Sequence, residues 1–109
     1  MPQAALRVLP EALRSRDSAT FTGSYQTLGT PLEFPSRLLV IKNNSTVAVT
    51  ISWDGTTDAD VLPSGTFVVL DFCANRVADA PLVVAALTQL YVKGSAGTGS
   101  VYLSSYYAR

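Results

Sequence analysis

Asp54, Asp58 and Asp60 lie within seven residues of one another and form the densest group of possible metal ligands in the chain. Hard cations such as Ca²⁺ bind several carboxylate oxygens at once. A helix-loop-helix calcium site, however, has acidic residues at alternate positions, a central glycine and a terminal glutamate, and this spacing does not match it. We therefore expect Asp54 to belong to a turn and the other two carboxylates to cap the loop or to be solvated, with no metal bound.

A glycine-rich run at residues 94–99 (GSAGTG) has the composition of a phosphate-binding loop. Such a loop also needs a lysine and a hydroxyl residue at the start of a helix, whereas a strand-like segment around Val101 and Leu103 follows here. The run is therefore predicted to be a hairpin loop that joins two paired strands. We expect no phosphate-bearing cofactor at this loop.

Nucleophilic catalysis has few candidate residues in this sequence. There is no histidine, which removes the commonest general base, the Ser-His and Cys-His pairs and the commonest transition-metal ligand. Cys73 is the single cysteine and is predicted to be a buried structural thiol. A carboxylate pair such as Asp54 with Asp58 is all that remains for catalysis. We expect neither an enzyme nor a cofactor.

The charge balance excludes further classes of partner. Basic and acidic residues number eight each, and only two of the basic residues, Lys42 and Lys93, are lysines. Binding to a phosphate backbone is therefore not expected. The amino-terminal segment lacks the pattern of a secretory signal, and no apolar run reaches the ~18 residues of a membrane span. The sequence predicts a cytosolic protein without nucleic-acid or membrane partners.

The elements that carry these residues are predicted to be strands. From Thr20 onward, short runs of β-branched and aromatic residues are interrupted about every eight to twelve residues by Gly, Pro, Asn or Asp. This pattern is typical of an antiparallel β-sandwich. We therefore predict an all-β, jelly-roll-like sandwich of about seven or eight strands over residues 20–109, preceded by an extended arm over residues 1–19.

A hairpin is predicted in the first half of this domain. Residues 36–42 and 47–53 read as strands, and residues 43–46 (NNST) read as the turn between them. Apolar and polar residues alternate in the second strand, which turns Val49 and Ile51 toward the core.

A second strand pattern covers residues 66–72. Apolar side chains occur at both odd and even positions of this segment, which predicts a strand buried on both faces in the centre of a sheet. Residues 74–87 fit a short helix or a strand, and the pattern does not decide between the two.

The amino-terminal arm differs in composition from the rest of the chain. Its apolar side chains belong to Leu6, Val8, Leu9 and Leu13, and its arginines are Arg7, Arg14 and Arg16. Pro10 interrupts any long helix but can begin a short one over residues 10–14. We interpret the segment as an arm that docks on a neighbouring protein and becomes ordered there, with an untethered terminus as the alternative. Its arginines face an acidic partner surface or are solvated.

Tyrosines make up half of the aromatic residues outside the arm. Tyr91, Tyr102 and Tyr106 fall on the polar faces of two strands that the glycine loop is expected to pair, which predicts one aromatic patch. Such patches serve protein interfaces or sugar stacking, and the alternative is that the rings only cover the edge of the core. The predicted interface residues are therefore Leu6, Val8, Leu9, Leu13, Tyr91, Tyr102 and Tyr106.

Two segments of the chain resemble a known class of protein. Residues 41–76 (IKNNSTVAVTISWDGTTDADVLPSGTFVVLDFCANR) and 89–108 (QLYVKGSAGTGSVYLSSYYA) look like small virion proteins encoded in the structural modules of tailed bacteriophages. The resemblance covers roughly residues 20–108 and rests on turns and strands. It implies a β-sandwich structural subunit and assigns no active site.

Two functional hypotheses follow from these observations. The first is a non-enzymatic virion structural protein that assembles as a multimer in the head-to-tail region or on the capsid or tail surface. It is incorporated in the host cytoplasm, its partners are other virion proteins and copies of itself, and its amino-terminal arm docks on a neighbouring subunit. The alternative is a carbohydrate- or receptor-binding β-sandwich module that uses the aromatic patch.

Overall fold

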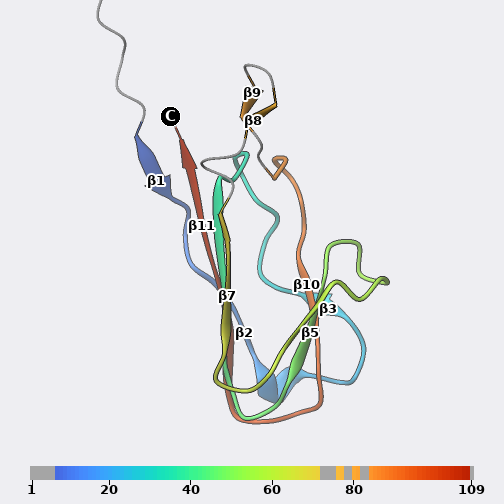
Figure 1. The fold of residues 1–109 in the computed structure, drawn as a ribbon. Coiled ribbons are helices and arrows are strands. Elements are labelled where there is room, and N and C mark those ends of the chain that lie inside the picture. Colours follow the sequence, from blue (N-terminus) through green and yellow to red (C-terminus); the bar gives the residue numbers. More distant parts are fainter. Residues whose placement is uncertain (1–6, 72–75, 78–79, 82–83, 109) are drawn as a thin grey trace, which may run out of the picture.

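The computed structural model describes residues 7–71, 76–77, 80–81 and 84–108, and this part of the chain is all-β. Two main antiparallel sheets lie face to face (Figure 1). The first sheet contains, in order, β1 (Val8–Pro10) with β2 (Arg14–Asp17), then β11 (Gly99–Ala108), β4 (Leu38–Ser45) and β7 (Phe67–Asp71). The second contains β3 (Gln26–Thr27), β10 (Tyr91–Lys93), β5 (Val49–Ser52) and β6 (Asp60–Leu62). A separate ribbon pairs β8 (Arg76–Val77) with β9 (Ala80–Pro81).

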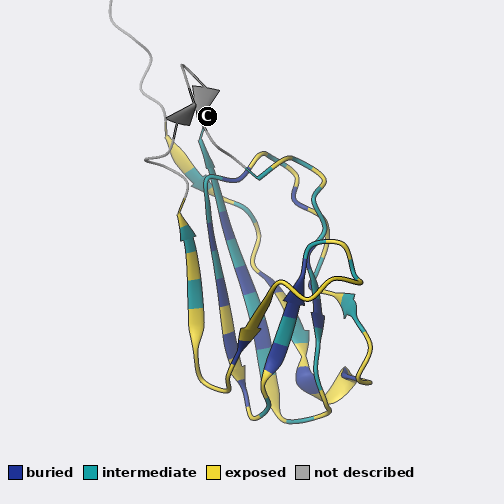
Figure 2. Ribbon diagram, turned by 45° about the vertical axis from the view of Figure 1, so that its right-hand side comes forward, coloured by how far each residue is buried: buried dark blue, intermediate teal, exposed yellow. Residues whose placement is uncertain are grey.

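The hydrophobic core lies between the two main sheets, as the colouring of Figure 2 shows. Alternate residues of each long strand face inward, because successive side chains of a strand point to opposite faces. The buried core residues are Phe21, Leu28, Leu32, Leu39, Ile41, Val49, Ile51, Leu62, Leu90, Val92, Val101 and Leu103. The prediction of an all-β chain built from antiparallel sheets is therefore confirmed.

The predicted hairpin of residues 36–42 and 47–53 is wrong, although the inward orientation of Val49 and Ile51 is confirmed. β4 pairs with β11 and β7 in the first sheet, whereas β5 pairs with β10 and β6 in the second. The turn after β4 therefore carries the chain from one sheet to the other. The two segments face each other across the core and share no ladder of hydrogen bonds.

The glycine run of residues 94–99 is another crossing between sheets and not a hairpin loop. β10 pairs with β3 and β5, and β11 pairs with β1, β2 and β4, so the two strands on either side of the run belong to different sheets. The backbone N–H of Gly23 donates to the carbonyl of Gly94 at 3.0 Å, and the N–H of Gly97 donates to the carbonyl of Ser18 at 3.2 Å. These hydrogen bonds hold the crossing against the amino-terminal loops.

β7 lies at the edge of the first sheet, which corrects the prediction that this segment is a central, buried strand. Among the described residues its ladder partner is β4 alone. Val68 and Leu70 pack against the core, but Phe67 is 66% exposed and Val69 is 48% exposed. Apolar residues occur on both faces of β7, which is why burial of both faces was predicted. The sequence pattern does not show that only one of these faces is covered by the second sheet.

The amino-terminal segment forms the other edge of this sheet. Val8 pairs with Ala108 and Arg14 pairs with Leu103, so β1 and β2 lie one after the other along β11. The short helix predicted at residues 10–14 does not form. The described part of the expected arm is thus integrated into the sheet of its own chain. Leu6 and Cys73 lie outside the described residues, as do residues 74–75, 78–79 and 82–83 of the ambiguous segment 74–87.

A buried ion pair fixes this segment to the domain. The Arg14 guanidinium lies 2.7 Å from the Glu11 carboxylate, and their side chains are 6% and 3% exposed. Arg14 also donates to the carbonyls of Thr30 and Pro31 at 2.7 and 2.9 Å. Gly29 leaves room for this side chain, because a Cβ there would lie 2.5 Å from the Arg14 Cβ.

The Glu11 carboxylate is in turn held by the loop after Gly29. Its Oε1 accepts the N–H of Glu33 at 3.1 Å and its Oε2 accepts the N–H of Phe34 at 3.2 Å. Burial alone raises the pKa of Glu11, but these two backbone donors and the Arg14 guanidinium outweigh burial, so the pKa lies below its ordinary value. The ionised carboxylate is the form that the fold stabilises.

Asn43, near the end of β4, joins two crossings between the sheets. Its side chain is buried, and its Nδ2 donates to the carbonyls of Val47 at 2.8 Å and Leu62 at 2.9 Å. Its Oδ1 accepts the N–H of Ser45 at 3.1 Å. One amide thus satisfies the backbone of both the β4–β5 and the β6–β7 connections, which explains why the chain crosses between sheets at this point.

Candidate interaction surface

The outward side of the first sheet presents side chains in rows that cross four strands. Residues that are directly opposite in a ladder point to the same face. One row contains Ser15, Tyr102, Lys42 and Phe67, the next contains Ser104, Val40 and Val69, and a third contains Pro10, Tyr106, Leu38 and Asp71. We call this surface the outer face.

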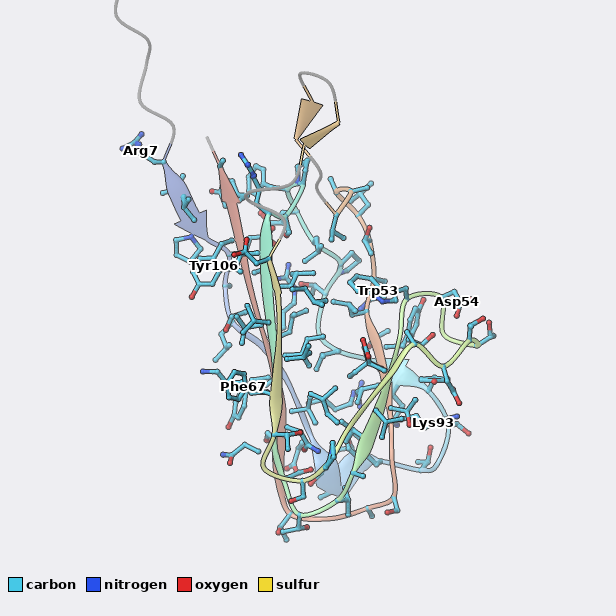
Figure 3. The ribbon with its side chains drawn as sticks, viewed as in Figure 1. Arg7, Trp53, Asp54, Phe67, Lys93 and Tyr106 are labelled. Atoms are coloured by element: carbon cyan, nitrogen blue, oxygen red, sulfur yellow. The ribbon has the colours of Figure 1, made fainter. Side chains whose placement is uncertain are left out.

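The outer face contains several apolar and aromatic side chains that are exposed or half-buried. Phe67 and Val69 are exposed on β7, and Val40, Tyr102 and Tyr106 are half-buried beside them. Figure 3 shows Phe67 and Tyr106 on the side of the molecule away from the second sheet. Surface patches of contiguous apolar residues on soluble proteins mark contacts with other molecules.

A shallow groove of about 440 Å³ crosses one end of the outer face. Leu13, Tyr102 and Phe67 contribute its apolar walls, and Leu13 is 62% exposed. Lys42 and Asn44 contribute polar groups to the same groove. The groove thus brings a residue of the amino-terminal segment together with β11 and β7.

The predicted interface residues are divided between different surfaces. Tyr102, Tyr106 and Leu13 belong to the outer face or its groove, and Val8 is exposed at the end of β1. Leu9 pairs with Tyr107, whose ring stacks on Phe34 at a centroid distance of 4.1 Å, so Leu9 faces the other side of the sheet.

Tyr91 does not join the tyrosines of the outer face, which corrects the prediction of a single aromatic patch. It lies on β10 in the second sheet, beside the loop after β5. Its ring is so close to Gly55 that a Cβ there would lie 3.3 Å from it. The expected patch required β10 to pair with β11, and the crossing between them separates the rings.

A polar cluster occupies the second sheet near Tyr91. The Tyr25 hydroxyl donates to Asp58, and the Lys93 ammonium lies 3.2 Å from the same carboxylate and 4.5 Å from the centre of the Tyr25 ring. Figure 3 shows Lys93 beside the loop that contains Asp54. These contacts fasten the loop after Trp53 to β10 and to the segment before β3.

Two carboxylates of this loop, those of Asp54 and Asp58, are engaged by donors of the same chain. Hydrogen bonds from the backbone N–H groups of Thr57 and Thr56, at 2.7 and 2.8 Å, hold the pKa of Asp54 far below its ordinary value. The Tyr25 hydroxyl and then Lys93 lower the pKa of Asp58. Within the described residues, no group of three or more His, Cys, Asp or Glu side chains is arranged to hold a metal ion.

Replacing Asp58 with asparagine is expected to lower the pKa of Tyr25 from about 12 toward its ordinary value of about 10. Burial and the hydrogen bond and charge of Asp58 raise this pKa, and the substitution removes the last two contributions. Alkaline titration of tyrosinate absorbance measures the change, and Tyr25→Phe identifies the titrating ring. Asp60→Asn, in the same loop, serves as the control, and an equal shift in that variant would contradict the assignment.

Phe67 and Val69 are surface residues that the sequence did not identify. Their pattern indicated burial, and nothing local distinguishes an edge strand from a central one. The charge pattern gave no such signal either, because the one charged residue of β7 is Asp71 at its end. Natural edge strands usually carry charged residues, so this pattern also favoured a central strand.

The comparisons add no assignment to this geometry. No helix among residues 7–71, 76–77, 80–81 and 84–108 has the length and apolarity needed to cross a membrane. Neither the protein-family models nor the curated proteins with which the chain was compared contain a match to it.

Proposed function

We propose that this protein is a non-enzymatic structural subunit that is incorporated in several copies into the virion of a tailed bacteriophage. Its position is the head-to-tail region or the surface of the capsid or tail, and assembly takes place in the host cytoplasm. The observation that carries the proposal is the outer face, where the exposed Phe67 and Val69 lie in one sheet with the half-buried Tyr102. A surface of this kind fits another protein subunit better than a small substrate.

The order of the strands supports a jelly-roll-like fold within this proposal. The chain passes from β2 to β3 in the second sheet, to β4 in the first, to β5 and β6 in the second, to β7 in the first, and finally to β10 and β11. With β1 and β2 counted as one interrupted edge, each sheet has four strands. Jelly rolls of two such layers are common in viral capsid proteins and in lectins.

The low charge of the outer face also supports a role in assembly. Lys42 is its only basic side chain, and Asp71 lies at its corner. Contacts made by apolar and hydroxyl groups are less sensitive to salt than ion pairs on a surface. A structural subunit that must stay bound to the same neighbouring subunits at different salt concentrations is therefore expected to use such contacts.

The amino-terminal segment takes part in the proposed contacts through its exposed apolar side chains. Val8 is 58% exposed and Leu13 lines the groove, so a neighbouring subunit can cover both. Arg14 and Arg16 act within their own chain, because Arg14 pairs with Glu11 and the Arg16 Nε donates to the carbonyl of Thr27 at 2.7 Å. The docking contact is therefore apolar in character.

Charged substitutions on the outer face test the proposal. Leu13→Glu and Tyr102→Glu are expected to reduce incorporation into purified particles at least ~10-fold, since each places a carboxylate in an apolar contact. Val61→Glu is the matched control, because Val61 is 64% exposed on β6 of the second sheet. Immunoblotting and electron microscopy of the particles give the result. Absence of the wild-type protein from mature virions would refute the proposal.

A carbohydrate- or receptor-binding module remains the second candidate, because the groove places polar groups beside a tyrosine ring. Tyr102, Ser104 and Asn44 line it together, and an aromatic ring with neighbouring hydrogen-bonding groups is a common platform for sugars. Glycan binding that Tyr102→Ala abolishes, without loss of folding, would favour this function. An array without bound glycans would exclude it.

A further inference from the structure

The hydrogen-bond pattern of β4 determines which groups of β7 face the open edge. The Asn43 N–H donates to the carbonyl of Thr66 at 2.8 Å, whereas the Thr46 N–H donates toward β11, to the carbonyl of Thr98 at 2.9 Å. In an antiparallel sheet, the backbone N–H and C=O groups of successive residues point alternately to one neighbouring strand and to the other. With Ile41 opposite Val68, the odd-numbered residues of β4 therefore bond to β7, and the N–H and C=O groups of Val69 and Phe67 point away from β4.

Within the described residues, β7 has little of what normally protects a sheet edge, because its one charged residue, Asp71, lies at its end. Natural edge strands are short, bulged or carry proline or lysine, which prevents pairing with other chains. The strand Phe67–Asp71 contains none of these residue types, and its outward side chains Phe67 and Val69 are exposed. The other edges differ, because β1 contains Pro10, β3 has only two residues, and β6 has only three and begins with Asp60.

We infer that β7 pairs antiparallel with β7 of a second copy, with Val69 on a two-fold axis, so that the two first sheets form one continuous sheet. The inference rests on the proposed function, which requires several copies. Val69 then lies opposite its own counterpart and exchanges two N–H to C=O hydrogen bonds with it. Phe67 lies opposite Asp71 of the other copy, because both are two positions from Val69.

A second copy fits this edge because the pairing is self-complementary. The same groups of Phe67 and Val69 face outward in both copies, and a two-fold axis makes donors of one meet acceptors of the other. Lys42 neighbours Phe67 in its own copy, so unlike charges, Lys42 and the other copy's Asp71, flank the ring. Val69 with Val69 is a β-branched cross-strand pair of the kind that packs well.

Pairing also explains the sequence of this strand. Residues 66–72 have the apolar pattern of a central strand, yet one copy of the chain places β7 at an edge. In the dimer, β7 becomes a central strand, and the outer faces of the two copies join beside the axis. The two grooves lined by Phe67 then lie on one extended apolar surface, which is available to the other subunits of the assembly.

Light scattering of the purified protein tests the pairing through a matched pair of substitutions. The wild type is expected to be a dimer. Val69→Pro is expected to be a monomer, since proline removes an N–H that points away from β4 and leaves the β4 ladder intact. Val69→Thr keeps the N–H and the branched shape and is expected to remain a dimer. A monomeric wild type, or a Val69→Pro variant that stays dimeric, would overturn the inference.

Disulfide formation gives a second test that does not depend on how well the proline variant folds. Val69→Cys in a Cys73→Ser background is expected to form a covalent dimer on oxidation, because Cα atoms of a hydrogen-bonded pair lie about 5.5 Å apart, within disulfide reach. Val61→Cys in the same background, exposed on β6, is expected to stay monomeric. Equal cross-linking of both variants, or of neither, would overturn the pairing.

The two proposals fail in different ways. If Val69→Pro leaves the oligomer unchanged while Leu13→Glu and Tyr102→Glu prevent incorporation into particles, the edge pairing is wrong and the structural role stands. If the wild type dimerises through Val69 but is absent from virions, the pairing stands and the structural role is wrong.

Discussion

Replacing Asn43 with leucine is expected to lower the free energy of unfolding by about 3 kcal/mol, because it removes a buried hydrogen-bonding side chain. The buried amide is the hydrogen-bond partner of the Val47 and Leu62 carbonyls and of the Ser45 N–H. Leucine fills similar space but leaves these backbone groups without that partner in the interior. Each such group costs about 1–3 kcal/mol.

Urea unfolding followed by tryptophan fluorescence measures this loss, since Trp53 packs against the core. Asn44→Ala is the control, because the neighbouring Asn44 is exposed and its removal is expected to change stability by at most ~0.5 kcal/mol. Equal effects of the two substitutions would show that the Asn43 side chain does not hold the crossings together.

Replacing Glu11 with leucine is expected to cost about 3–5 kcal/mol, because it leaves the buried Arg14 guanidinium without its carboxylate. The same change removes the acceptor of the Glu33 and Phe34 N–H groups. We expect β1 to separate from β11 as a consequence, since the ion pair is the main buried contact of that segment. Hydrogen exchange of the Leu9 amide reports the separation.

The double variant Glu11→Leu with Arg14→Leu shows whether the interaction between the two side chains, and not each side chain separately, determines the loss of stability. It is expected to be more stable than Glu11→Leu alone, since no buried charge is left without a partner. Glu33→Leu, which alters an exposed carboxylate in the same region, serves as the control and is expected to be nearly neutral. Strictly additive losses would refute coupling between Glu11 and Arg14.

The same ion pair makes stability depend on pH in the acid range. The folded state lowers the pKa of Glu11, so its contribution is complete above the ordinary value of about 4.3 and is lost as the pH falls through the lowered value. In Glu11→Gln this contribution is absent at every pH. The difference in unfolding free energy between wild type and variant is therefore expected to shrink with acidification, and a constant difference would contradict the assignment.

The class of the fold could be predicted from the sequence because it depends on local pattern. The alternation around Val49 and Ile51, and again around Val101 and Leu103, identified strands and their buried faces correctly. Alternation with a period of two residues indicates which side chains face the core, and this indication does not depend on which strands pair. Asp54 was likewise expected in a turn and lies in one, because its carboxylate bonds to backbone N–H groups two and three residues ahead.

Strand pairing could not be predicted, because a turn does not reveal which sheet the next strand joins. Residues 43–46 and 94–99 have turn-like compositions that suit a hairpin. Residues 43–45 instead belong to β4, and the connection after them crosses to the other sheet, as does the run 94–99. In the first case the decisive group is Asn43, whose amide bonds to Leu62, a residue distant in sequence. Contacts between residues that are distant in sequence leave no local sequence pattern. The sheet that β10 joins could therefore not be predicted, and Tyr91 was assigned to the wrong surface.

β11 has a consequence for how the chain reaches its folded state. It is the last of the described strands in chain order, yet it pairs with β1, β2 and β4, and Val8 lies opposite Ala108. The first sheet therefore cannot close until β11 itself has been synthesised. Such non-local pairing gives a high contact order, so folding is expected on the timescale of milliseconds to seconds. Until β11 arrives, β4 and β7 expose their edges, and nascent chains depend on protection from premature association.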